Sequence, residues 1–212
     1  MKLPAFLPRG VGWVYKPAAL ALFVAVLAAL ASLPVRDFLE ASMARHMLVQ
    51  YPLLMLCGAL AASGLSVTSA GHAAARPMSV AHWNAHGITG LAAAALALAV
   101  LMIPRVLDLA LVNPWVEFIK MTTLVACGAA IYTSWRPAGR LVQGFFLGQV
   151  LPMMAVAGTL YESSPTRVCN AYLLDDQVLL GQWLVWIAAS IALGWVAALF
   201  RSLVQKSAVP AA

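Results

Sequence analysis

Charged residues are scarce in this chain. Of its 212 residues, 9% are charged and 63% are hydrophobic, whereas a typical soluble domain carries about 25% charged residues. The longest stretches between its apolar runs, 66–81 and 162–177, are too short to fold alone. The composition therefore predicts one integral membrane domain over residues 1–212.

Several functional signatures are also missing. No cluster of basic side chains suggests a surface that follows phosphates, so the net charge of +6 does not indicate nucleic-acid binding. There is no Walker loop, HExxH motif or nucleophile elbow, and we predict that the protein is not an enzyme. Three cysteines, two of them inside apolar runs, do not make a disulfide framework.

Long apolar runs fill most of the chain. A membrane helix needs about 20 mostly apolar residues, because its backbone groups must be satisfied within the segment. Six runs qualify: 18–33, 47–67, 82–103, 114–133, 141–161 and 178–199. The sequence predicts an all-α, polytopic bundle of about six membrane helices.

Lysine and arginine positions predict the orientation, because cytoplasmic loops retain positive charge. With the N-terminus inside, eight cations fall on the inner side: Lys2, Arg9, Lys16, Arg76, Arg136, Arg140, Arg201 and Lys206. Four fall on the outer side: Arg36, Arg45, Arg105 and Arg167. This favours both termini in the cytoplasm of a bacterium and a multi-pass protein of the inner (plasma) membrane.

A weak internal repeat joins two parts of the chain. The stretch from Leu33-Pro34 to Cys57-Gly58 and the stretch from Ile103-Pro104 to Cys127-Gly128 have similar beginnings, ends and lengths. Such parallel repeats bring equivalent helix ends together. The alternative is chance similarity between Ala/Leu-rich helices. If the repeat is real, Glu117 lies near the position of His46.

The outer end of the second run carries a candidate metal site. Met43 and Met47 are four residues apart and His46 lies between them, so helical spacing places the three on overlapping faces. Thioethers and imidazole form a soft ligand set that suits copper(I). The alternative is ordinary packing of methionine and hydrogen bonding of one interfacial histidine.

Possible partners of this outer site are Glu117, Lys120, Asp176 and Gln177. Ionisable groups inside a membrane helix are costly and usually pair or face a cavity. We therefore predict that Glu117 and Lys120 face the bundle, toward His46 or each other. Helix capping is an alternative role for Asp176.

A second group of histidines, His72, His82 and His86, falls on the inner side. His82 and His86 are four apart at the predicted start of the third run, so both rings point from one helix face. They are an alternative site for a metal or for the edge of a haem b. We expect these three to be dispensable for metal loading if His46 is the centre of the site.

The run Met43-x-x-His46-Met-Leu-x-x-x-Pro52-Leu-Leu resembles the signature of the CtaG-type cytochrome c oxidase assembly proteins, which are membrane factors of copper delivery. The segment from Tyr161 through Asp176-Gln177 to Trp186 is similar to the closing element of that family. The resemblance implies that His46 is a copper ligand and that Asp176 and Gln177 belong to the same site. Ser42 stands where the family has a further histidine.

Together these patterns predict a CtaG-like membrane factor for copper delivery to, or assembly of, a respiratory or oxidising metalloenzyme. Its partners would be the lipid bilayer and membrane or periplasmic subunits of that enzyme. The alternative is a non-catalytic membrane subunit of a respiratory or oxidoreductase complex that holds haem b through the inner histidines. A permease is a weaker alternative, because no discontinuous helix pair is evident.

Overall fold

The computed structural model describes residues 15–69, 84 and 86–207. In this part of the chain the regular structure is helical: α1 (Tyr15–Ala31), α2 (Leu33–Glu40), α3 (Met43–Arg45), the π-helix η2 (His46–Gln50), α4 (Tyr51–Ser69), α6 (Ile88–Leu101), α7 (Pro104–Val112), α8 (Pro114–Trp135), α9 (Arg140–Ser163) and α10 (Leu174–Ser207). The prediction of an all-α fold is confirmed for these residues.

Among the described residues, four helices are long and apolar enough to cross a membrane, and the number rises to six if each of two bent helix pairs forms one span. Many large apolar side chains point outward, among them Leu96, Phe145 and Leu193, each at least 70% exposed. Exposed apolar surface of this extent is typical of a protein that contacts lipid rather than water. A membrane protein is therefore supported.

Both bent pairs lie where proline opens a short helix. α1 and α2 meet at 66°, and α6 and α7 meet at 74°. Proline fits the first turn of a helix, where its missing N–H costs nothing, but it interrupts a helix that approaches from the N-terminal side. Pro34 and Pro104 both occupy the first turn of the second helix. The predicted run 18–33 thus ends earlier, and a separate helix follows it.

The third run also differs from its prediction. α6 begins at Ile88 rather than at residue 82. Gly87 has a left-handed φ of 70°, which glycine adopts without a Cβ penalty. The side chain of Asn84 accepts a hydrogen bond from the backbone N–H of Gly90, which satisfies a free donor of the first turn. These two features start the helix at Ile88.

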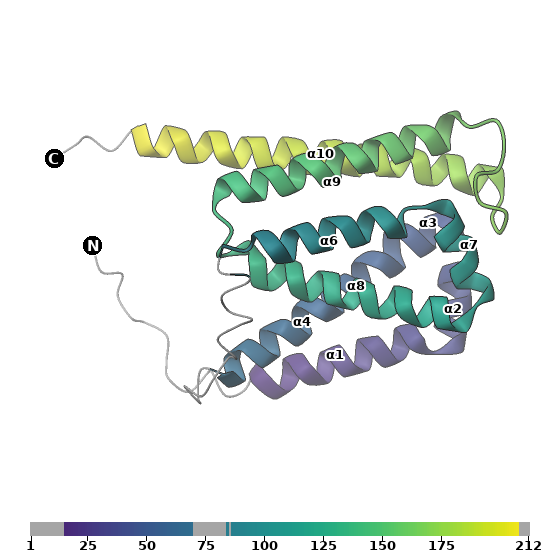
Figure 1. Cartoon of the computed structure of the whole chain (residues 1–212), viewed down its shortest axis with the longest axis horizontal. Helices are drawn as coiled ribbons and strands as arrows, with labels where there is room; N and C mark the ends of the chain where they lie inside the picture. Colours follow the sequence, from purple (N-terminus) through teal and green to yellow (C-terminus); the bar gives the residue numbers. More distant parts are fainter. Residues whose placement is uncertain (1–14, 70–83, 85, 208–212) are drawn as a thin grey trace.

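The centre of the fold is the crossing of α4 and α8 (Figure 1). A Cβ added to Gly58 of α4 would overlap the carbonyl of Val125, and one added to Gly128 of α8 would overlap the carbonyl of Met55. The two helices therefore approach backbone to backbone, which replaces the hydrophobic force that lipid does not supply. α1 packs on α4, α6 packs on α8, and α9 pairs with α10 along the other side of α6 (Figure 1).

The structure supports the internal repeat. α2 and α7 are equivalent short helices after a bend, and both lie at the same end of the molecule, called here the α2–α7 end (Figure 1). The equivalent glycines Gly58 and Gly128 each contact the opposite helix. The repeat thus places the N-terminal ends of α4 and α8 together, and the candidate site lies there.

Candidate functional site at the α2–α7 end

His46 is completely buried and begins the π-helix η2. Pro52 explains the wide turn, since it has no N–H to donate to the carbonyl of Leu48 and its ring crowds that carbonyl. A π-turn inserted in a longer helix is frequent at functional sites. Met43 and Met47 on either side are also buried, within the same apolar cluster as Tyr51 and Tyr172.

Lys120 of α8 is the hub of the polar contacts. Its Nζ lies 2.6 Å from Oε2 of Glu117 and 2.7 Å from Nε2 of His46. Oε1 of Gln50 is 3.4 Å away and Oε1 of Glu40 is 3.5 Å away. The ammonium, which can only donate, forms hydrogen bonds with His46 and Gln50. It forms ion pairs with the carboxylates of Glu117 and Glu40. The prediction that Glu117 and Lys120 face the bundle, toward His46 or each other, is confirmed: both are buried, they pair with each other, and Lys120 also contacts His46.

The hydrogen bonds assign the tautomer of His46. Since the Lys120 ammonium can only donate, Nε2 is the acceptor and Nδ1 carries the proton. Nδ1 lies 2.6 Å from Oη of Tyr172 and donates to it. Burial, with the Glu40 charge nearby, raises the pKa of Tyr172 above its usual value, so its hydroxyl stays protonated. His46 is thus a neutral imidazole between an ammonium and a phenol.

The carboxylates balance the cations. Glu40 lies 3.6 Å from Nε of Arg36, which reaches the surface, and also accepts from Nε2 of Gln50 at 3.3 Å. Glu117 and Lys120 are the buried pair. With two cations and two carboxylates the cluster is neutral, as burial requires. Neither carboxylate oxygen of Glu117 has a hydrogen-bond partner within the part of the chain that the structure describes, so its contact with Lys120 is an ion pair.

A loop between α9 and α10 covers this cluster and supplies Tyr172. Asp108 of α7 accepts hydrogen bonds from the backbone N–H groups of Asn170 and Ala171 at 3.0 and 3.4 Å. Gln177 accepts from the N–H of Val168 at 2.8 Å and donates to the carbonyl of Tyr161 at 3.1 Å. These contacts fix the loop that carries Tyr172, the residue that orients His46.

Asp176 and Gln177 therefore act differently from the prediction. Asp176 accepts a hydrogen bond from Ser42 at 3.2 Å and so joins α10 to the residue that precedes α3. Gln177 forms hydrogen bonds with backbone groups of Val168 in the loop and Tyr161 in the last turn of α9, and not with His46. Both lie at the same end as His46, and among the described residues neither forms a hydrogen bond or ion pair with the imidazole.

Sequence reasoning missed Glu40, Gln50, Asp108 and Tyr172. A signal existed for Gln50, because it is a polar side chain four residues after His46 in an otherwise apolar run. Tyr172 carries no such signal, since 126 residues separate it from its partner.

The inner histidines are only partly described. His72 and His82 lie outside the described residues. His86 is exposed in a turn ahead of α6, so it does not share a helix face in the predicted way. The N-terminal end of α6 lies at the end of the molecule opposite the α2–α7 end (Figure 1).

The described residues offer few side chains that could bind a metal ion together. No group of three or more His, Cys, Asp or Glu side chains there could hold a metal ion. Both ring nitrogens of His46 are engaged, by Tyr172 and Lys120. Copper(I) would therefore depend on Nε2 of His46 and the thioethers of Met43 and Met47, with the Lys120 ammonium displaced.

Over the residues that the structure describes, the chain is all-helical, with four to six possible membrane spans and a neutral, buried charge cluster at one end. No family model matches the chain, and no curated protein or solved structure matches it.

Cys169 is expected to react slowly with maleimide although it lies in a loop. It is 1% exposed, and burial together with the Asp108 charge raises the pKa of its thiol to about 12. At pH 8 about one thiol in ten thousand is then ionised, against about a quarter for an ordinary cysteine. Cys57 and Cys127 are buried too. Labelling followed by mass spectrometry should find the wild-type protein nearly unmodified, and Thr166→Cys, at an exposed loop position, should add one fast site. Rapid labelling of Cys169 would contradict the packing of this loop.

Proposed function

We propose that this protein is an integral membrane factor that carries copper(I) as cargo during the assembly of a respiratory or oxidising metalloenzyme. In this proposal both termini are cytoplasmic, the α2–α7 end faces the periplasm of a bacterial inner membrane, and His46 is the centre of the copper site. Met43 and Met47 supply the soft ligands beside it.

The observation that carries the proposal is the state of His46. Its Nδ1–H is held by Tyr172, and its Nε2 lone pair is directed at a monovalent cation, the Lys120 ammonium. A histidine that binds metal typically donates its other ring N–H to a fixed acceptor, which sets the tautomer. Tyr172 is such an acceptor, so the imidazole is already in the form that a metal ligand requires.

Charge balance supports exchange of the two cations. Copper(I) and an ammonium both carry a single positive charge, so replacement of one by the other leaves the balance with Glu117 and Glu40 unchanged. Lys120 has a long flexible side chain, and in this proposal it stabilises the empty site and withdraws when copper binds.

The test is the copper(I) affinity of the detergent-purified protein. His46→Ala removes one of about three ligands and should weaken binding at least about tenfold, or 1.4 kcal/mol. His82→Ala/His86→Ala is the control and should bind as the wild type does. If His46→Ala binds copper(I) as the wild type does and His82→Ala/His86→Ala loses binding, the copper site lies at the inner histidines and not at His46.

Two further measurements separate the alternatives. An absorption spectrum with a Soret band in the purified protein would favour a haem b subunit, whereas near-stoichiometric copper without that band favours the carrier. The orientation is tested in intact cells with Thr166→Cys and a membrane-impermeant thiol reagent, because Cys169 is buried. If the introduced cysteine is protected from the reagent in intact cells, the proposed topology is contradicted.

A further inference from the structure

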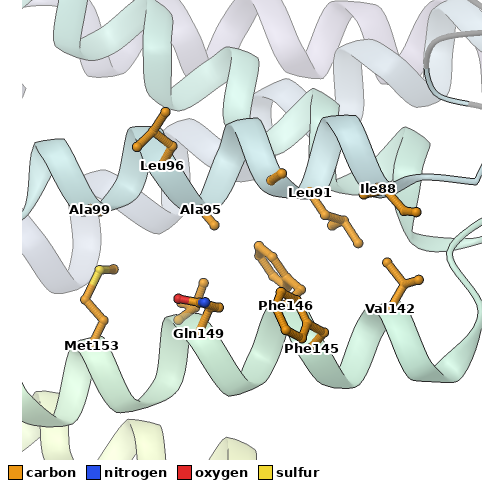
Figure 2. Close-up of a pocket in the computed structure, with 12 residues that line it drawn as sticks. Ile88, Leu91, Ala95, Leu96, Ala99, Val142, Phe145, Phe146, Gln149 and Met153 are labelled. Carbon is orange, nitrogen blue, oxygen red and sulfur yellow. The ribbon is translucent and has the colours of Figure 1, made fainter.

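A second feature, independent of His46, lies between α6 and α9. Side chains of these two helices line a groove of about 340 Å³ (Figure 2). Leu91, Ala95 and Ala99 line it from α6, and Phe146, Gln149 and Met153 line it from α9. Gln149 is the one polar side chain among the described residues that line it.

Gln149 lies deep in a candidate membrane span. It is about 14 Å along α9 from Arg140 and about 21 Å from Ser163 at 1.5 Å per residue, and the hydrocarbon core is about 30 Å thick. The side chain is exposed, and no described residue exchanges a hydrogen bond with it. An unpaired amide at this depth is costly, so the groove is complementary to an apolar molecule with a hydrogen-bonding group.

We propose that this groove binds the ring of an isoprenoid quinone, with a ring carbonyl accepting a hydrogen bond from Nε2 of Gln149. Phe145 and Phe146 supply aromatic faces for the ring. Ala95 and Ala99 leave a smooth apolar wall for the isoprenoid tail. The molecule enters from the bilayer, since the groove opens on an apolar, lipid-facing side that includes Leu96.

The depth and volume of the groove favour a small molecule. The polar head and ester groups of a phospholipid stay near the membrane surface, outside the hydrocarbon core, and do not reach Gln149. The volume of the groove is about 340 Å³. It lies within the range of about 300–1,000 Å³ for small-molecule sites.

The test is a titration of the purified protein with a decyl-substituted benzoquinone, followed by tryptophan fluorescence. Trp135 reports on the groove, since its ring packs edge-to-face on Phe146 at 6.3 Å. Gln149→Leu keeps the size of the side chain but removes the hydrogen bond, and should weaken binding about fivefold to tenfold. Ala95→Phe fills the groove and should abolish saturable quenching. Ala192→Phe is the matched control, because Ala192 lines a separate groove between α9 and α10.

Unchanged affinity in Gln149→Leu and Ala95→Phe would overturn the proposal. Native mass spectrometry would also overturn it if the wild type and Ala192→Phe form a dimer that Ala95→Phe does not form, because the groove would then bind a second copy of this chain. If instead the wild type and Ala192→Phe retain a phospholipid that Ala95→Phe lacks, the groove binds a lipid. If Ala95→Phe fails to fold, Gln149→Leu still decides the question. Copper loading plays no part in this measurement, so its result is separate from that for His46.

Discussion

Replacement of Lys120 with methionine is expected to lower the free energy of unfolding by about 3–5 kcal/mol. The ammonium is 1% exposed and lies 2.6 Å from the carboxylate of Glu117. Without it Glu117 is a buried charge with no opposite charge beside it, and His46 loses the donor to its Nε2. The measurement is chemical denaturation in a fixed detergent, with helical circular dichroism as the signal.

The control removes both partners. Lys120→Met/Glu117→Leu replaces the ion pair with apolar side chains of similar size, which is often neutral or stabilising for a buried pair. The double variant should recover most of the lost stability. Glu40 keeps Arg36 and Gln50 as partners in both variants. Equal destabilisation of the single and double variants would show that Glu117 is not the group that needs the Lys120 charge.

The central residues of the buried charge cluster were predictable, because a charged side chain in contact with lipid has a high free energy. Glu117 and Lys120 stand three residues apart within an apolar run, and ionisable groups inside a membrane helix usually pair or face the interior of the bundle. His46 was predicted as the centre of the site from its position between two methionines. The sequence thus indicated which end of the bundle carries the polar contacts, and those contacts join residues 74 positions apart.

Other parts were not predictable, for two physical reasons. Apolar content locates a helix but not its bends, so Pro34 and Pro104 had to be recognised as starts of new helices rather than loop residues. Tyr172 and Asp108 depend on the path of a loop between two helices. Loop paths follow from tertiary contacts, which no periodic pattern in the sequence records.

The crossing of α4 and α8 leads to a second large effect. Gly128→Ala is expected to destabilise the protein by about 1–3 kcal/mol, lowering the melting temperature by about 5 °C. The new methyl group would overlap the backbone carbonyl of Met55. A carbonyl in a helix cannot rotate away as a side chain does, so the two helices must separate.

Gly148→Ala is the matched control. Gly148 also lies in a membrane-length helix, and a Cβ added there meets nothing within 4 Å. Alanine has the better helix propensity, so this variant should melt at or slightly above the wild-type temperature. Equal melting temperatures for Gly128→Ala and Gly148→Ala would contradict the close approach of α4 and α8.

The double variant Gly58→Ala/Gly128→Ala tests whether one displacement relieves both overlaps. Each methyl group pushes the same two helices apart, since Gly58 faces Val125 and Gly128 faces Met55. Once the first substitution has separated them, the second finds part of its space already open. The loss of stability should therefore be smaller than the sum of the two single losses, as expected for sites that share a backbone shift. Strict additivity would mean that the two ends of the crossing move independently. In that case Gly58→Ala would leave the geometry of Gly128 unchanged.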